Sequence, residues 1–182
     1  MTTSPLRSPS QESDPQMPTI KSVDLRFEGG MLFRAEPSSG HPLSFDDRFS
    51  NQGGSPVETI LSALGACSAM DVVSIAGKKR QSIDQYEVHV RGSQRDEYPQ
   101  VFTEIEVVHA FVGRDLSEAA LRRSIELSAT KYCPVNAMIS AGATVVHHRY
   151  QIWSLGDEPF DAQGEVIATG PYARPDVLAD QT

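Results

Sequence analysis

Apolar side chains are densest between Ser55 and Arg80, and their spacing predicts one long helix. The apolar positions are Val57, Ile60, Leu61, Ala63, Leu64, Ala66, Cys67, Ala69, Met70, Val72, Val73, Ile75 and Ala76. They cover most of the helix circumference, and a helix that is apolar nearly all round is buried. Ser55 suits the N-cap, Pro56 the first helical position, and Glu58 completes a capping box. We therefore expect a central buried helix with Cys67 near its middle.

Alternating apolar and polar positions predict strands on both sides of this helix. The predicted strands are residues 20–27, 31–36, 42–45, 83–94, 101–111 and 144–153. Gly29 and Gly30 suit the turn of a first hairpin, and the Tyr98-Pro99 connection makes the fourth and fifth strands a long antiparallel hairpin.

Two further helices are expected between the fifth and sixth strands. Ser117 opens the first of them, and Pro134 suits the first position of a short second helix, which puts Cys133 at its N-cap. The order is three strands, a helix, two strands, two helices and a strand. That order predicts an α+β fold.

The chain divides into a core and two tails of different composition. Residues 1–18 are rich in Ser, Pro, Gln and Asp, which predicts a disordered N-terminal lead. Residues 19–154 form the expected folded domain, and residues 155–182 an acidic C-terminal extension that we expect either to be loose or to lie along the surface. One twisted sheet cannot cover a helix that is apolar on all sides, so a second subunit is the favoured way to complete the core.

Composition and charge exclude several classes of partner. The 182 residues include 16 Lys and Arg against 24 Asp and Glu, a net charge of -8, so nucleic acid is not expected as a partner. The first residues lack an apolar run, and Asp71 interrupts the best candidate for a membrane span. Two cysteines are too few for a disulfide scaffold. A cytoplasmic protein without a membrane partner is expected.

The two cysteines are the candidates for chemistry. Most buried cysteines are inert, so composition alone favours Cys67 as a core residue by about two to one. Cys133 differs, because a helix N-terminus and the nearby Lys131 both stabilise a thiolate. If the two side chains face each other, one sulfur can attack a substrate and the other can close a disulfide.

The histidines and cysteines do not have the spacing of a metal site. The histidines are scattered, at His41, His89, His109, His147 and His148. No Cys-x-x-Cys spacing occurs, so no metal site is predicted. Asp71 is the odd residue of an apolar helix, and a polar seam, a cap for a neighbouring element and an exposed position between subunits all remain open for it.

The two cysteine segments resemble a known family. The first reads Ser-Pro-x-Glu and then Leu61-x-Ala-Leu-Gly-Ala-Cys67-Ser-Ala-Met-Asp-Val-Val, and the second is Tyr132-Cys133-Pro134-Val135. Together they resemble the OsmC/Ohr family, the osmotically inducible and organic hydroperoxide resistance proteins, with wording closer to a less characterised OsmC-like branch. The resemblance covers roughly residues 20 to 153.

This resemblance implies a fold, an activity and a set of site residues. The implied fold is OsmC-like, with antiparallel sheets wrapped around the central helix in an intertwined homodimer. The implied enzyme is a two-cysteine peroxidase for organic hydroperoxides in oxidative stress defence, which uses no cofactor and needs a lipoyl- or thioredoxin-type dithiol as reductant. Cys67 matches the peroxidatic cysteine and Cys133 the resolving one. Glu58 and Arg48 match the acidic residue and the arginine of the family's site.

The resemblance and the local sequence disagree on which cysteine attacks first, and two alternative functions remain open. Local physics favours Cys133 as the thiolate, whereas the family assigns the first attack to Cys67. We follow the family, because a buried arginine such as Arg48 can outweigh a helix dipole worth about 0.3–1 kcal/mol. The alternatives are a non-catalytic dimer that binds a small apolar ligand and a thiol redox sensor.

Overall fold

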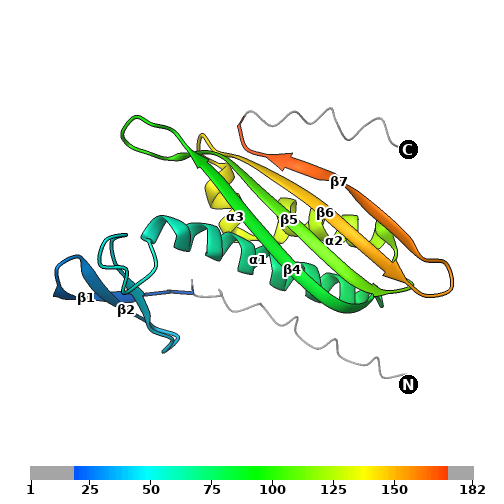
Figure 1. The fold of residues 1–182 in the computed structure, drawn as a ribbon, viewed down its shortest axis with the longest axis horizontal. Coiled ribbons are helices and arrows are strands. Elements are labelled where there is room, and N and C mark those ends of the chain that lie inside the picture. The colour runs from blue at the N-terminus through cyan, green and yellow to red at the C-terminus, as the bar shows by residue number, and fades with distance from the viewer. Residues whose placement is uncertain (1–18, 172–182) are drawn as a thin grey trace, which may run out of the picture. The chain divides into compact units, whose positions relative to one another are not determined.

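A computed structural model describes residues 19–171, which divide into two compact units, residues 19–55 and 56–171 (Figure 1). The predicted N-terminal lead and the last part of the predicted C-terminal extension lie outside the described residues. Each unit is described by itself below.

The first unit is a three-stranded antiparallel sheet in the order β1-β2-β3. Its strands are β1 (Val23–Gly29), β2 (Leu32–Pro37) and β3 (Leu43–Phe45). Gly29 and Gly30 adopt φ values of 117° and 58°, which glycine tolerates best, and they make the predicted turn. In the loop after β3, Asp46 is buried and accepts hydrogen bonds from the backbone of Asp47 and Gln52.

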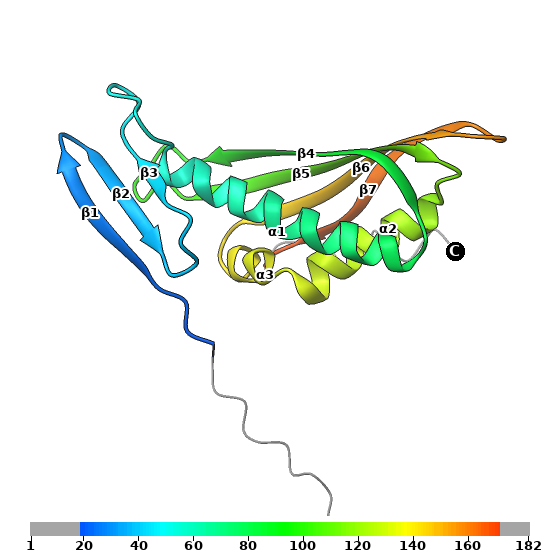
Figure 2. The same ribbon diagram turned by 90° about the horizontal axis from the view of Figure 1, so that it is seen from below.

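The second unit places its helices against one face of a four-stranded sheet (Figure 2). Its elements are α1 (Pro56–Lys78), β4 (Ser82–Gln94), β5 (Phe102–Arg114), α2 (Glu118–Leu127), the π-helical turn η1 (Ser128–Tyr132), α3 (Pro134–Ser140), β6 (Val145–Leu155) and β7 (Phe160–Thr169). The strand order is β4-β5-β6-β7. The predicted α+β class, the long central helix and the β4–β5 hairpin are confirmed.

The sheet is mixed, which corrects the expectation of antiparallel sheets. β5 and β6 run parallel, while the β4–β5 and β6–β7 pairs are antiparallel. Parallel neighbours need a crossover connection, and here α2, η1 and α3 supply it. The crossover lays these helices on the same face of the sheet as α1, and so brings the second cysteine segment toward the first (Figure 2).

Residues 160–169 form β7, so the expectation of a loose extension is wrong for this part of it. Phe160, Ala162, Gly164 and Val166 alternate with polar residues, the pattern of a half-buried strand. Packing accounts for the glycine at position 164, because a Cβ there would lie 2.9 Å from the hydroxyl of Tyr150 on β6. The signal was present in the sequence, but acidic neighbours obscured it.

The described chain buries one face of α1, as expected for an apolar helix that a single sheet cannot cover. Its buried residues are Leu64, Gly65, Ser68, Val72 and Ala76. Gly65 allows close packing on β4, because a Cβ there would lie 2.9 Å from Val90. The other face exposes apolar side chains, with Met70 74% and Val73 49% exposed. A single sheet covers one side of a helix and leaves the opposite side uncovered.

By length and composition alone, α1 could also cross a membrane. The core helix of a globular protein often passes the same test. Asp71 accepts a hydrogen bond from Ser128 of η1, and α1 packs along β4 and α2. We therefore treat α1 as a core helix.

Candidate thiol site

Cys67 and Cys133 come together where α1 faces the start of α3. Cys67 lies in the middle of α1, and Cys133 is the N-cap of α3 as predicted, with φ -74° and ψ 104°. Their sulfur atoms and a carboxylate oxygen of Asp71 all lie within 4.8 Å of one another. We call these three residues the thiol cluster. Both cysteines are free, so the site holds a reduced pair at a short distance.

The two cysteines differ in burial. Cys133 is 3% exposed and belongs to the apolar core, whereas Cys67 is partly exposed. Burial raises the pKa of the Cys133 thiol to about 12, and a hydrogen bond from that thiol to the Cys67 sulfur adds to the effect. Cys133 is therefore protonated at neutral pH.

The expectation from local sequence that Cys133 is the better activated thiolate is thus wrong. The backbone N–H of Asn136 does donate to the Cys133 sulfur at 3.3 Å and acts to lower its pKa, but desolvation outweighs it. The Lys131 ammonium lies 5.3 Å from the ring centroid of Tyr132, and it is not among the groups that shift the pKa of Cys133.

Asp71 occupies a polar seam between α1 and η1, one of the three positions that the sequence left open for it. Its Oδ2 accepts a hydrogen bond from Ser128 Oγ at 3.1 Å, and Ser128 Oγ also lies 3.3 Å from Ser68 Oγ. Asp71 faces both cysteines, which was not predicted from the sequence. The signal was its spacing, because residues i and i+4 of a helix share a face and Asp71 is four residues after Cys67.

Glu58 lies in the second unit but far from the thiol pair, and Arg48 lies in the first unit. Glu58 lies in the first turn of α1, and nine residues of helix separate it from Cys67, about 14 Å along the axis. Arg48 belongs to the first unit, where its guanidinium lies 4.9 Å from the ring centroid of Phe49. The roles of both residues stay predictions.

A second polar group lies inside the second unit, and we call it the histidine column. It consists of Tyr86, His109, His148 and Asn136. Tyr86 Oη and His109 Nδ1 are 2.7 Å apart, the two histidine rings stack with centroids 6.0 Å apart, and His148 Nε2 lies 3.0 Å from Asn136 Oδ1. Both histidines are fully buried, which lowers the pKa of His109 to about 3 and of His148 to about 4. They are neutral core residues.

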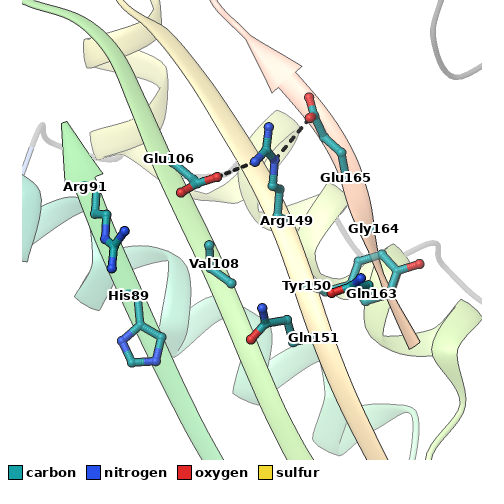
Figure 3. A pocket seen from close by; sticks show the side chains of 10 residues that line it. All are labelled: His89, Arg91, Glu106, Val108, Arg149, Tyr150, Gln151, Gln163, Gly164 and Glu165. Atoms are coloured by element: carbon teal, nitrogen blue, oxygen red, sulfur yellow. Dashed lines mark hydrogen bonds and ion pairs between the residues drawn. The ribbon is translucent and has the colours of Figure 1, made fainter. Parts of the chain in front are cut away.

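One hollow of the second unit lies away from the cysteines. It has a volume of about 700 Å³ and is lined by side chains of β4, β5, β6 and β7 (Figure 3). Arg149 forms ion pairs there with Glu106 and Glu165, so its charge is already compensated within the sheet (Figure 3). No residue of the thiol cluster lines this hollow, and we assign it no chemistry.

A second hollow, of about 630 Å³, runs beside α1 and β4. Most of its lining is apolar or small: Leu61, Gly65, Ala66, Ala69, Val88 and Val90. Glu58, Ser62 and Tyr86 add the polar atoms. This groove follows the helix that bears Cys67.

The chain is similar to known proteins in sequence and in fold. The chain is 41% identical to protein YhfA of Escherichia coli strain K12 over 123 residues, 68% of this chain and 92% of YhfA. A hypothetical protein from Aquifex aeolicus is 28% identical with a TM-score of 0.65, covering 77% of this chain and 99% of that one. The fold is also that of OhrB, an organic hydroperoxide resistance protein of Bacillus subtilis, with 18% identity, a TM-score of 0.52 and coverage of 72% and 98%. Residues 49–148 match the family described as OsmC-like protein, and the chain belongs to that family.

Proposed function

We propose that this protein is a two-cysteine peroxidase that reduces organic hydroperoxides to alcohols. The observation that supports this most directly is the reduced pair itself, with the Cys67 and Cys133 sulfur atoms within 4.8 Å of each other. A disulfide needs a sulfur–sulfur bond of about 2.05 Å, so a small side-chain movement would close it. The OsmC/Ohr family includes peroxidases, which fits this chemistry.

In the first step Cys67 attacks the hydroperoxide. Its sulfur is the more accessible of the two and accepts the hydrogen bond from Cys133. The thiolate attacks the terminal peroxide oxygen, the O–O bond breaks, and the alkoxide leaves with a proton as alcohol. Cys67 is thereby oxidised to a sulfenic acid. We assign Arg48 to stabilise the charge of this thiolate and Glu58 to orient the guanidinium.

In the second step Cys133 resolves the sulfenic acid. The Cys133 thiol loses its proton and its sulfur attacks Cys67, which releases hydroxide that leaves as water. A disulfide between Cys67 and Cys133 remains. A lipoyl- or thioredoxin-type dithiol then reduces it by thiol–disulfide exchange, as a cytoplasmic setting would provide.

The surroundings favour a hydroperoxide with a hydrocarbon tail over hydrogen peroxide. Cys67 packs against a core cluster that includes Leu64 and Ile105. Burying a hydrocarbon tail contributes about 25 cal/mol per Å² of apolar area, which hydrogen peroxide cannot supply.

We also propose a homodimer as the working form. The exposed face of α1, which includes Ile60, Met70 and Val73, is an unusual apolar surface for a monomer. β1 likewise exposes Val23, Leu25 and Phe27. A second copy would cover such surfaces and could bring the partner subunit's Arg48 or the partner's Glu58 to the thiol pair. Light scattering coupled to gel filtration, at micromolar protein, should give twice the chain mass.

The test is a free-thiol count before and after one equivalent of cumene hydroperoxide, with hydrogen peroxide in parallel. We expect rapid loss of both thiols, faster with the organic peroxide. A Cys133→Ser variant should stop at a Cys67 sulfenic acid that a dimedone probe traps, and a Cys67→Ser variant should not react. Two thiols that survive in the wild-type protein would overturn the proposal and favour the apolar ligand-binding dimer. Fast oxidation without turnover in the presence of a dithiol would favour the redox sensor.

A further inference from the structure

The thiol cluster also has the composition of a metal site. Within residues 19–171 it is the one group of three His, Cys, Asp or Glu side chains whose ligand atoms approach one another within 4.8 Å. Thiolate and carboxylate are both ligands of Zn²⁺, and three protein ligands with one open position are typical of accessible zinc sites. We propose that the reduced protein binds one Zn²⁺ through Cys67, Asp71 and Cys133. The proposal does not depend on the peroxidase function.

The spacing suits tetrahedral coordination. Zn–S bonds of about 2.3 Å and Zn–O bonds of about 2.0–2.2 Å put neighbouring ligand atoms about 3.5–3.8 Å apart. The observed limit of 4.8 Å requires each side chain to move inward by about 1 Å or less, within reach of side-chain rotation. Cys67 and Asp71 share one face of α1, and Cys133 approaches from α3, so two elements that pack together supply the ligands.

Other groups already orient two of the three ligands. The Ser128 hydroxyl donates to Asp71 Oδ2 at 3.1 Å, and the Asn136 N–H donates to the Cys133 sulfur at 3.3 Å. Hydrogen bonds of this kind fix the direction of metal ligands and raise their affinity. Cys67 and Asp71 are partly exposed, so a water molecule can take the fourth position and the ion can enter from solvent.

The charge balance also favours a cation. Two thiolates and a carboxylate would place three negative charges within one small site, which a divalent cation compensates in large part. Zn²⁺ replaces the thiol protons, which pass to solvent, and leaves a net charge of -1 on the site. No electron is transferred, and no other reactant is needed.

His147 is a poorer candidate for a metal ligand. Both ring nitrogens of His147 already face carboxylates, Nδ1 with Glu165 at 3.0 Å and Nε2 with Glu104 at 3.4 Å. Arg149 shares Glu165 and would repel a cation. His147→Ala is therefore a control, because it removes a possible metal ligand on the sheet and leaves the thiol cluster intact.

The experiment uses the full chain, reduced and stripped of metal, titrated with Co²⁺ as a coloured substitute and then with Zn²⁺ against a chromophoric chelator. We expect one Co²⁺ per chain with thiolate-to-cobalt charge-transfer absorption, and displacement by Zn²⁺. Cys67→Ser and Cys133→Ser should each remove about half of that absorption, because each leaves one thiolate. Asp71→Asn should keep the thiolates but weaken Zn²⁺ binding by at least about 10–100-fold.

The matched controls are His147→Ala and Asp84→Asn, which should leave the affinity unchanged. Absence of the charge-transfer band in the wild-type protein would overturn the proposal. So would an unchanged affinity in Asp71→Asn, or loss of binding in His147→Ala alone. Circular dichroism verifies the fold of each variant, and if Cys133→Ser does not fold, the two variants on α1 decide. Because no peroxide is used, the result is independent of whether the thiols reduce hydroperoxides.

Discussion

The thiol cluster and the histidine column lie within the same unit, yet they are suited to different tasks. In the thiol cluster two residues reach solvent, and the sulfur atoms face each other at a distance that chemistry can close. In the histidine column the rings are fully buried and held by hydrogen bonds, and their lowered pKa values keep them neutral. Access to solvent, more than the presence of titratable groups, separates a reactive site from a structural one.

Asn136 contacts both the thiol cluster and the histidine column. Its backbone N–H donates to Cys133, while its side chain accepts from His148 and donates to the Ala129 carbonyl. Because one residue holds both groups, a mutation in the column could in principle disturb the thiols. The predictions below are chosen to separate the two regions.

The largest expected effect is on turnover. Cys67→Ser should lower hydroperoxide reduction by about three orders of magnitude or more, because it removes the nucleophile. His148→Gln should leave turnover within a few-fold, since Gln can still donate to Asn136. Peroxide consumption in the presence of a dithiol measures both. Equal loss of turnover in a folded His148→Gln protein would contradict the division between the two regions.

The next effect is the pH dependence of stability. The folded-state pKa values of His109 and His148, about 3 and about 4, lie below the unfolded value of 6.5, so the unfolded chain binds protons first as pH falls. Their contribution is complete above pH 6.5 and decreases as pH falls below it. Each histidine should cost about 1.4 kcal/mol of unfolding free energy per pH unit.

Urea denaturation between pH 6.5 and 4.5 tests this, before most carboxylates take up protons. In His148→Gln the slope should fall to about half, since one of the two titrating groups is gone. A wild-type unfolding free energy that stays constant over this interval would show that the histidines are solvated rather than buried.

The fold was predictable wherever one pattern dominated. The helix expected from Ser55 to Arg80 is observed as α1 (Pro56–Lys78), and the Cys133 N-cap is as predicted, because capping residues and periodicity act locally. β7 escaped notice because its alternation is interrupted by Gly164 and acidic residues, and its partner, β6, is chosen by tertiary packing. Local signals cannot report such long-range pairing.

The candidate site was predictable only in part. The two cysteine segments and their family resemblance identified Cys67 and Cys133, but burial of Cys133 depends on the crossover that brings α3 to α1. The same crossover places Asp71 beside both sulfurs, which no spacing in the sequence could establish for Cys133. That burial raises the pKa of the Cys133 thiol, an effect that the local sequence could not indicate.

A smaller effect is expected from Asn136→Ala. The variant leaves the Ala129 carbonyl and His148 Nε2 without their partner, at a cost of about 1–3 kcal/mol for each buried group. The backbone N–H to Cys133 is retained, so cumene hydroperoxide should still remove both thiols. Denaturation and a thiol count on the same sample test both halves. A folded variant whose thiols no longer react would show that the column positions the cysteines.

The smallest effect is expected from Ser128→Ala. Asp71 loses one hydrogen-bond donor, but its carboxylate is partly exposed and water can replace the hydroxyl, so unfolding free energy should fall by only about 1 kcal/mol. Peroxide-driven thiol loss should be unchanged, while Zn²⁺ affinity should fall about tenfold because the ligand is less well oriented. Ser62→Ala is the matched control, since that hydroxyl bonds only the carbonyl of Glu58 on the same helix. If Ser128→Ala and Ser62→Ala behave alike in Zn²⁺ binding, Ser128 does not orient Asp71 for the metal, and Asp71→Asn alone decides whether Asp71 is a ligand.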